Sequence, residues 1–512
     1  MLIKTFGSAV YGINATTITV EVNCDVGTRF FLVGLPDNAV KESQQRLLAA
    51  FKNIGFKMPG RKIVVNMAPA DIRKEGSAYD VTIAIGVLAA SEQIPCEGLS
   101  DYIIMGEISL DGTILPIKGA LPIAIQAAKE GFKGFFLPKE NAREAAIVSD
   151  LIVYGVHNIT EVIDFFKGES TPERVTVDIQ EEFERFQSHS ELDFSDVKGQ
   201  ENIKRALEIA AAGGHNVILI GPPGAGKTML AKRLPTILPP LTVQEALETT
   251  KIHSVAGKVG KNTSLICTRP FRSPHHTISD VALVGGGGHP QPGEISLAHN
   301  GVLFLDELPE FKRTVLEVMR QPLEERKVTI SRARSSVEFP ASFMLVSSMN
   351  PCPCGFHNHP EKECVCGPGV VLKYLNKISG PLLDRIDIHV EVTPVPFSEL
   401  SKERISEKSE DVRARVVRAR KIQELRFAES ENIYCNSQMT AKQLRTICKI
   451  SPECNQLLKT AVERIGLSAR AYDRILKVAR TIADLAGSND IQAEHLAEAI
   501  QYRNLDREGW AG

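Results

Sequence analysis

The stretch that most constrains the fold of this chain is GPPGAGKT at residues 221–228. It follows the apolar run 217–220 and leads into residues 229–234, whose apolar side chains have helical spacing. A strand, a glycine-rich loop and a helix form the context in which G-x-x-x-x-G-K-[ST] binds phosphate. Backbone N–H groups of such a loop turn toward the phosphates, with the helix N-terminus behind them. A glycine-rich turn before an ordinary helix is the alternative, and the flanks favour a nucleoside triphosphate site.

The loop is expected to bind both ATP and Mg²⁺. Lys227 is expected to reach the β- and γ-phosphates, and the Thr228 hydroxyl to bind the metal ion. The residues expected to contact the nucleotide are Gly221, Pro222, Pro223, Gly224, Ala225, Gly226, Lys227 and Thr228.

Two carboxylates follow a second apolar run at 301–305, namely Asp306 and Glu307. In an open α/β sheet, ligands lie beyond the carboxyl ends of the strands, so both acids are expected to face the phosphates. Asp306 is expected to hold Mg²⁺ through water, and Glu307 to orient and activate the attacking water. Two acids in a solvated turn are the alternative, which the loop at 221–228 disfavours.

Length and composition restrict the classes of protein. The 512 residues suggest roughly three domains, and 43% hydrophobic with 24% charged residues is typical of a globular protein. A net charge of −2 excludes a generally basic surface, so nucleic-acid binding would require local patches. The N-terminus has no long apolar core or cleavage site, and no window approaches the ~18 apolar residues of a membrane helix. We expect a cytoplasmic protein without membrane contact.

Residues 1–166 are expected to form an α+β domain. Strand-like and helical patterns alternate there, at 17–22, 39–54, 61–65 and 80–91. The sequence MGEISLDGTILPI at 105–117 precedes a helical pattern and then GFFLPK at 134–139. These residues resemble the proteolytic domain of Lon and the inactive Lon-like domain of RadA, over about residues 70–145.

The resemblance to Lon does not extend to its catalytic pair. A Lon protease needs a serine nucleophile and a lysine base within hydrogen-bond reach. Alignment places Ala78 at the nucleophile, with Ser77 one residue away, and places Leu121 at the lysine, with Lys118 three residues earlier. The resemblance therefore implies an inactive scaffold or interaction domain.

Residues 167–192 are polar and weakly periodic, which predicts a linker. The following DFSDVKGQ at 193–200 precedes a helical pattern near 201–212. This segment resembles the lead-in of AAA+ ATPases, which packs near the adenine. A simple helix cap is the alternative, because Asp and Ser are common at helix starts.

A third strand-like run, 342–349, ends at Asn350. It resembles the sensor strand of AAA+ proteins, whose polar residue contacts the γ-phosphate or the water. Arg385 precedes another apolar run and resembles the arginine finger, which can act in trans on a neighbouring subunit. The alternative is a surface arginine paired with Asp384 or Asp387.

Two insertions separate the chain from a plain nucleotide-binding core. The segment between Lys227 and Asp306 far exceeds the dozen or so residues that a crossover requires. The second insertion is predicted to be a hairpin of strands 326–330 and 336–339, with Arg332 and Arg334 in the turn.

On these motifs, the chain resembles the ComM (YifB) family of magnesium-chelatase-like ATPases over essentially all 512 residues. The resemblance implies an α/β fold: an AAA+ P-loop module with a helix-2 insert, a pre-sensor hairpin and a C-terminal helical lid, preceded by the α+β Lon-like domain. MCM helicases share both insertions and project them into a ring channel to grip DNA. By resemblance, Arg332 and Arg334 are DNA contacts in a homo-hexamer, and a solvated hairpin tip is the alternative.

Four cysteines are bunched within residues 352–366, and two histidines lie between them. Four thiolates can make a tetrahedral zinc site, although each pair here is C-x-C, tighter than the usual spacing. Reduced, unliganded thiols are the alternative in a cytoplasm. The candidate zinc ligands are Cys352, Cys354, Cys364 and Cys366.

The AAA+ core is expected at 193–395 and a helical arm and lid at 396–512. Residues 399–428 are either an exposed charged arm or a solvated helix, and the latter is favoured. Arg470 resembles the second sensor, which contacts the γ-phosphate, with Arg474 as the second choice. The remaining helical patterns lie at 439–449, 452–465, 468–486 and 491–503.

Three functions compete. The family resemblance implies a ring ATPase that drives branch migration on single-stranded or branched DNA during natural transformation, with recombination proteins as further partners. A magnesium-chelatase-like ATPase that remodels a protein partner is the alternative, and it is weakened because the chelatase motor subunit lacks the Lon-like domain. A Lon-like protease is disfavoured by the missing serine and lysine.

Overall fold

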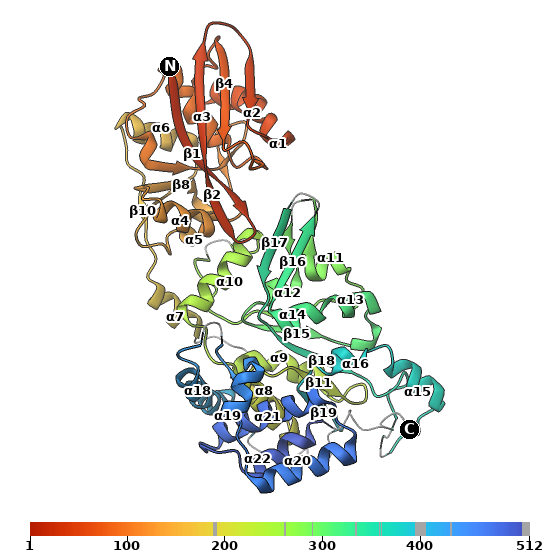
Figure 1. Ribbon diagram of the computed structural model, residues 1–512. Coiled ribbons are helices and arrows are strands. Elements are labelled where there is room, and N and C mark those ends of the chain that lie inside the picture. Colours follow the sequence, from red (N-terminus) through yellow and green to blue (C-terminus); the bar gives the residue numbers. More distant parts are fainter. Residues whose placement is uncertain are drawn as a thin grey trace.

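The computed structural model describes most of the chain up to residue 503. The described ranges are 1–187, 192–260, 263–288, 290–332, 335–357, 359, 361–394, 406–430 and 433–503. Figure 1 shows an upper domain in red and orange that contains the N-terminus, a mainly green middle part, and a mainly blue helical part below it. The α/β architecture predicted from the sequence is confirmed.

The N-terminal domain is built on a mixed sheet of eight strands, in the order β10-β9-β8-β5-β1-β2-β4-β3. Its inward side chains alternate with outward ones, as in β2, where Ile18, Val20 and Val22 are fully buried. The strands of this domain, including the separate pair β6-β7, are β1 (Leu2–Tyr11), β2 (Asn14–Asp25), β3 (Phe30–Val33), β4 (Lys62–Ala68), β5 (Tyr102–Ile104), β6 (Glu107–Ile108), β7 (Ile114–Leu115), β8 (Gly134–Pro138), β9 (Ile152–Val156) and β10 (Arg174–Val175).

Helices cover this sheet. The central one, α3, is buried along its whole length because it is apolar on all sides. The helices are α1 (Asn38–Lys41), α2 (Ser43–Asn53), α3 (Asp80–Ala90), α4 (Ala120–Lys129), α5 (Lys139–Ala145) and α6 (Ile159–Lys167).

The ATPase core contains a parallel sheet of five strands in the order β12-β15-β18-β11-β19. Three of its strands, β11, β15 and β18, are buried throughout, as expected of a parallel sheet covered on both faces. The strands are β11 (Val217–Ile220), β12 (Phe271–Arg272), β15 (Val302–Leu305), β18 (Met344–Met349) and β19 (Ile388–Glu391). The flanking helices are α8 (Glu201–Gly213), α9 (Lys227–Ile237), α13 (Arg313–Val318), α14 (Arg320–Glu325), α15 (Pro368–Leu375) and α16 (Gly380–Leu383).

Both predicted insertions are present. The first forms α10 (Val243–Val255), α11 (Asp280–Val284), β13 (Gly285–Gly286), β14 (Gln291–Pro292) and α12 (Glu294–Leu297), in addition to β12. The second is the antiparallel hairpin of β16 (Lys327–Arg332) and β17 (Ser335–Pro340), which confirms the predicted pre-sensor hairpin.

The C-terminal part is helical. It shares one hydrophobic core with α8, α9 and one face of the sheet. Within the described part of the chain, no helix is both long and apolar enough to cross a membrane. The helices are α18 (Ser409–Arg426), α19 (Ala441–Ile447), α20 (Pro452–Ile465), α21 (Ala469–Leu485) and α22 (Ala493–Gln501).

The segment predicted as a linker contains two ordered elements. β10 pairs antiparallel with β9, and α7 (Ile179–Gln187) follows it. On α7, the buried carboxylate of Glu182 accepts hydrogen bonds from Arg143 of the N-terminal domain, at 2.7 Å, and from the Ser264 hydroxyl of the core. The polar composition predicted a linker, and the Glu182 side chain is hydrogen-bonded between the two domains that this segment connects.

Candidate active site

The phosphate-binding loop lies at the carboxyl end of β11, the position that ligands occupy in an open α/β sheet. Gly224 and Gly226 have positive φ values of 79° and 86°. This backbone conformation is strained for residues with a Cβ, so glycine is required at both positions. Gly226 is the N-cap of α9, and the backbone N–H groups of that helix start point into the loop.

Lys227 connects the loop to the neighbouring strand β18. Its Nζ donates hydrogen bonds to the carbonyl oxygens of Gly221 and Pro222, at 2.7 and 2.9 Å, and to Oδ1 of Asn350 at 3.0 Å. Burial lowers the pKa of Lys227, while the charges of Asp306 and Glu307 oppose that shift. The structure therefore brings the predicted lysine and sensor residues into direct contact.

The predicted magnesium ligands also lie together. The Thr228 hydroxyl donates to Oδ2 of Asp306 at 2.7 Å. The other carboxylate oxygen of Asp306 accepts from the hydroxyl of Ser348 on β18. Hydroxyl and carboxylate oxygens are ligands that Mg²⁺ prefers, so this donor set fits the ion. Ser348 was not predicted, although residues 348 and 350 share one face of the strand by their spacing.

Glu307 stands at the edge of this group with a more exposed side chain, 57% accessible. Its φ of 54° is unusual for a residue other than glycine, and such strained backbone is often found at functional sites. Oε2 of Glu307 lies 3.8 Å from Nδ1 of His276, which belongs to the first insertion. Sequence reasoning noted this insertion but assigned no role to His276.

The candidate arginine finger, Arg385, and the candidate second sensor, Arg470, lie elsewhere in the chain. Arg385 precedes β19, is buried, and donates hydrogen bonds to Glu324 and to the carbonyl of Pro381. Arg470 is exposed and lies 3.6 Å from Asp384. Both are at the amino end of the sheet, opposite the phosphate loop, so the structure does not bring either to Lys227 of the same chain.

The alternative second sensor, Arg474, forms a 3.0 Å ion pair with the buried Asp387. Burial favours the neutral carboxylic acid, but the charges of Arg474 and His215 outweigh it and lower the pKa of Asp387. Arg474 is thereby committed to a structural ion pair.

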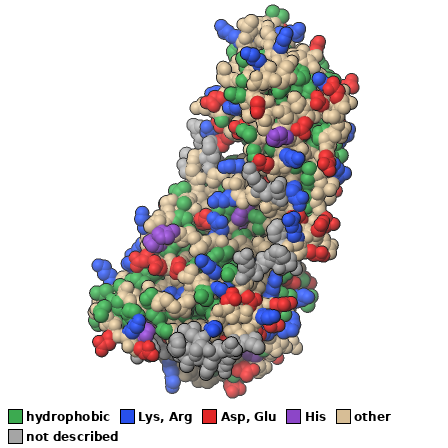
Figure 2. All heavy atoms as spheres, turned by 180° about the vertical axis from the view of Figure 1, so that it is seen from behind, with side chains coloured by type: hydrophobic (Ala, Val, Ile, Leu, Met, Phe, Trp, Pro, Cys, Tyr) green, Lys and Arg blue, Asp and Glu red, His purple; other side chains and the backbone are tan. Residues whose placement is uncertain are grey.

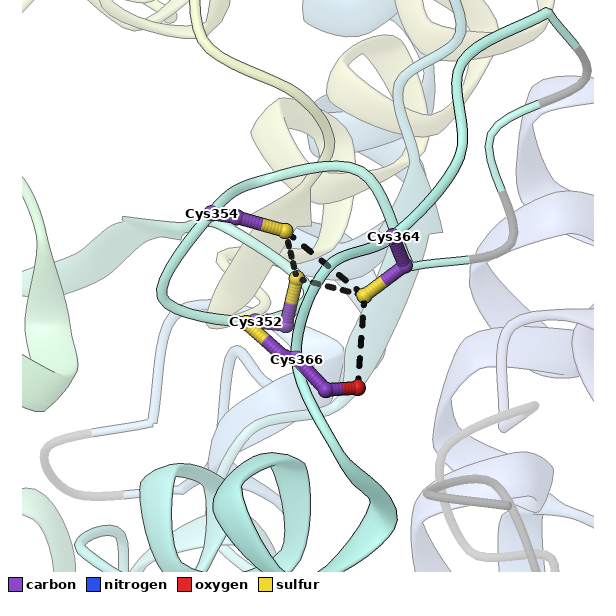
Figure 3. A group of neighbouring side chains, drawn as sticks. All are labelled: Cys352, Cys354, Cys364 and Cys366. Carbon is purple, nitrogen blue, oxygen red and sulfur yellow. Dashed lines mark hydrogen bonds between the residues drawn. The ribbon is translucent and has the colours of Figure 1, made fainter.

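The four candidate zinc ligands converge, as Figure 3 shows. The sulfur atoms of Cys352, Cys354, Cys364 and Cys366 all lie within 4.8 Å of one another. The tight C-x-C spacing therefore does not prevent a four-sulfur cluster.

The candidate DNA contacts lie at the end of the hairpin. Arg332 is the last residue of β16, and its backbone pairs with Ser335. The Arg332 side chain and all of Arg334 lie outside the described residues.

At the Lon-like positions, Ala78 packs against the core of the N-terminal domain. Leu121 is fully buried at the junction with the ATPase core, beside Leu241. The Ser77 hydroxyl donates to Glu107, and the buried Lys74 donates to the carbonyl of Pro69. These contacts contain no serine–lysine pair.

Three family profiles match successive parts of the chain. Residues 20–141 match the profile described as Subunit ChlI of Mg-chelatase. Residues 193–400 match Magnesium chelatase, subunit ChlI, and residues 406–503 match Magnesium chelatase, subunit ChlI C-terminal. Lon protease 2 of Bacillus subtilis is 34% identical over 159 residues, which cover 28% of this chain and 27% of that protein.

Two relatives match over nearly the full length. Competence protein ComM of Haemophilus influenzae is 44% identical over 505 residues, 98% of this chain and 97% of that protein. The protein YifB of Escherichia coli, described as uncharacterized, is 44% identical over 503 residues, 98% of this chain and 96% of its own. The chain therefore belongs to the ComM (YifB) family of magnesium-chelatase-like AAA+ ATPases, with a Lon-like N-terminal domain.

Proposed function

We propose that this ATPase is a ring motor that acts on DNA, as a hexamer that drives branch migration when incoming single-stranded DNA recombines during natural transformation. The similarity to a competence protein over 98% of the chain is the observation that carries the proposal. The pre-sensor hairpin supports it, because the sequence at the turn between β16 and β17 is basic and contains Arg332 and Arg334. Such a motor works in the cytoplasm.

Within one subunit, Lys227 binds phosphate, and Thr228 and Asp306 hold Mg²⁺. The ion supplies charge neutralisation at the phosphates. Glu307 then accepts the proton of the attacking water, while Asn350 orients the γ-phosphate or that water.

Residues at the amino ends of the strands contribute to the nucleotide site of the next subunit. Arg385 and Arg470 flank Asp384 at the amino end of β19. In a closed ring, the amino ends of these strands in one subunit meet the phosphate loop of the neighbouring subunit at every interface. Both arginines then stabilise charge in the neighbour's site, after Arg385 leaves Glu324.

The Lon-like domain is a scaffold with no proteolytic role, because its contacts supply no nucleophile–base pair. Magnesium-chelatase-like remodelling of a protein partner is the second candidate, favoured by the family profile over residues 193–400.

The deciding experiment measures ATP hydrolysis by the pure protein with and without single-stranded or branched DNA, together with strand exchange on a three-strand branched substrate. We expect DNA to raise the rate and ATP to drive exchange, with Glu307→Gln inactive in both. ATP hydrolysis that is indifferent to every DNA, without strand exchange, would favour the remodelling function.

A further inference from the structure

The four cysteines belong to a loop that lies against the phosphate-binding loop. This cysteine loop, residues 351–366, begins directly after Asn350. Gly355 has a φ of 84°, and a Cβ placed there would lie 2.5 Å from Cδ of Pro223. Only glycine permits both that conformation and that approach. The cysteine loop is therefore packed on the nucleotide machinery rather than separate from it.

The sulfur geometry fits a tetrahedral metal ion. Cys352 lies 3.3 Å from Cys354 and 3.7 Å from Cys364, and Cys354 lies 3.6 Å from Cys364 (Figure 3). A Zn–S bond of about 2.3 Å places the sulfur atoms of a tetrahedral site roughly 3.8 Å apart. A disulfide would need about 2.05 Å, and all four thiols are free. Four sulfur ligands in this arrangement select zinc(II) or iron.

A pocket lies between the cysteine loop, the first residues of the phosphate loop and the segment after β19. His357 and His359 line it from the cysteine loop, and Gly221 and Pro222 line it from the phosphate loop. Nε2 of His357 is buried and has no hydrogen-bond partner among the described residues. A buried imidazole nitrogen without a partner is unfavourable, so it indicates a missing hydrogen-bonding group.

His357 links the pocket to the metal site, because it lines the pocket and is hydrogen-bonded to a candidate metal ligand. The backbone N–H of His357 donates to Sγ of Cys352 at 3.3 Å. A cation bound by Cys352 fixes that sulfur, and through the hydrogen bond it fixes the position of His357. The lead-in segment contacts one wall of this pocket, because Nε2 of Gln200 donates to the carbonyl of Thr393, a lining residue, at 2.6 Å.

We propose that the cysteine loop binds one zinc ion and forms the wall of the pocket for the purine base of the nucleotide, with His357 hydrogen-bonded to the base. The inference rests on the proposed binding of ATP. It predicts that metal loading sets the affinity for the base, whereas Lys227 and the phosphate loop set the affinity for the phosphates.

The test uses full-length protein and two probes that compete with a fluorescent ATP analogue: ATP, and inorganic tripolyphosphate, which has no base. We expect about one zinc per chain by elemental analysis. The His357→Ala variant should keep its zinc, lose roughly two- to tenfold in affinity for ATP, and bind tripolyphosphate unchanged. The double variant Cys364→Ser with Cys366→Ser should lose the zinc and at least as much ATP affinity.

Matched controls separate the outcomes. The pair Cys24→Ser and Cys96→Ser, in the N-terminal domain, should keep both zinc and ATP affinity. If the cysteine-loop variant does not fold, zinc removal from the parent by a chelator gives the same comparison. Metal-free parent protein, or equal losses for ATP and tripolyphosphate in His357→Ala, would overturn the proposal. A parent that binds neither probe would instead overturn the ATPase function, whatever its zinc content.

Discussion

At the scale of single residues, Lys227 and Glu307 are expected to fail in different ways. In the proposed mechanism Lys227 contacts phosphate in the ground state, so Lys227→Ala should weaken nucleotide binding by about 10- to 100-fold. The same mechanism has Glu307 act on the attacking water, so Glu307→Gln should bind ATP normally while turnover falls by roughly 10²- to 10⁴-fold. Fluorescent-nucleotide binding and phosphate release measure the two effects.

Glu310→Gln is the control for Glu307, because Glu310 is a nearby acid that pairs with Lys377 at the surface. It should change neither measurement. Near-normal turnover in Glu307→Gln would exclude Glu307 as the residue that activates water.

Ser348 tests how Asp306 is positioned for Mg²⁺. Removing its hydroxyl takes one of two donors from Oδ1 of Asp306, which also accepts from the backbone N–H of Glu307 at 3.1 Å, and the lost bond costs about 1 kcal/mol. Ser348→Ala should therefore raise the Mg²⁺ concentration that gives half-maximal ATPase activity several-fold. The adjacent Ser347→Ala removes a hydroxyl that donates to the carbonyl of Val217, at 3.3 Å, and should leave the Mg²⁺ requirement unchanged. Equal effects of the two substitutions would contradict the assigned role.

Sequence motifs predicted those candidate site residues whose positions are determined by the segment in which they lie. Lys227 and Thr228 are fixed by the loop and helix that contain them, and Asp306 by the end of its strand. Ser348 and His276 were missed because their importance comes from contacts with residues that are distant in sequence. A serine or a histidine alone carries no comparable signal.

At the scale of elements, the hairpin β16–β17 can be tested as the DNA contact. A translocating motor contacts phosphates rather than bases, so replacing Arg332 and Arg334 with alanine should weaken binding equally for all sequences. The slope of log affinity against log salt should flatten by roughly 0.7 to 0.9 for each lost phosphate contact. Basal ATP hydrolysis should survive, while stimulation by DNA and strand exchange fall together.

Lys327→Ala is the control within the same hairpin, because Lys327 pairs with Glu338 across its base, at 2.8 Å. This substitution should leave the salt slope unchanged. An arginine double variant that binds, responds to DNA and exchanges strands like the parent would place the DNA contact elsewhere.

Helices and strands were predicted correctly where the pattern of a single segment determines its structure. Prediction was incomplete where a segment is stabilised by contacts with two domains. The hairpin and the helices after residue 438 follow from hydrophobic spacing alone. Helix α7 was assigned to a linker because its sequence is polar. It is ordered because Glu182 finds hydrogen-bond partners in both neighbouring domains, which the sequence of the segment does not reveal. The convergence of two C-x-C pairs also depends on how the cysteine loop folds back, which spacing does not determine.

At the scale of the whole molecule, the N-terminal domain touches the hairpin. The Tyr11 hydroxyl donates to the carbonyl of Ser336 at 3.1 Å, and Ile13 packs against the hydrophobic core beneath β17. We predict that Ile13→Asp will reduce stimulation of ATP hydrolysis by DNA and leave the basal rate intact, because it disturbs the support of the hairpin. Val26→Asp, at a fully exposed position of the same domain, is the control. Unchanged stimulation in Ile13→Asp would show that this contact does not support the hairpin.

The proposed ring would have to assemble through local features of the surface, because the net charge of −2 is small. Figure 2 shows basic and acidic side chains interspersed over the face seen from behind. Hydrophobic side chains are exposed in the cysteine loop, where Val365 is 86% accessible, and on α15, where Val370 and Leu372 are 50% and 48% accessible. A ring contact at this end of the core would cover them.

The ring itself is tested by mixing two inactive proteins. In a Lys227→Ala subunit the phosphate site is broken but Arg385 is intact, and in an Arg385→Ala subunit the reverse holds. If Arg385 serves the neighbouring site, then about one quarter of the interfaces in an equal, random mixture regain both parts. ATP hydrolysis should therefore reappear on mixing, at roughly that fraction of the parent rate, while each variant alone stays inactive. Light scattering with ATP and DNA would establish the assembly in parallel. Full activity in a protein that remains monomeric under those conditions would refute the ring, and with it the role of Arg385 between subunits.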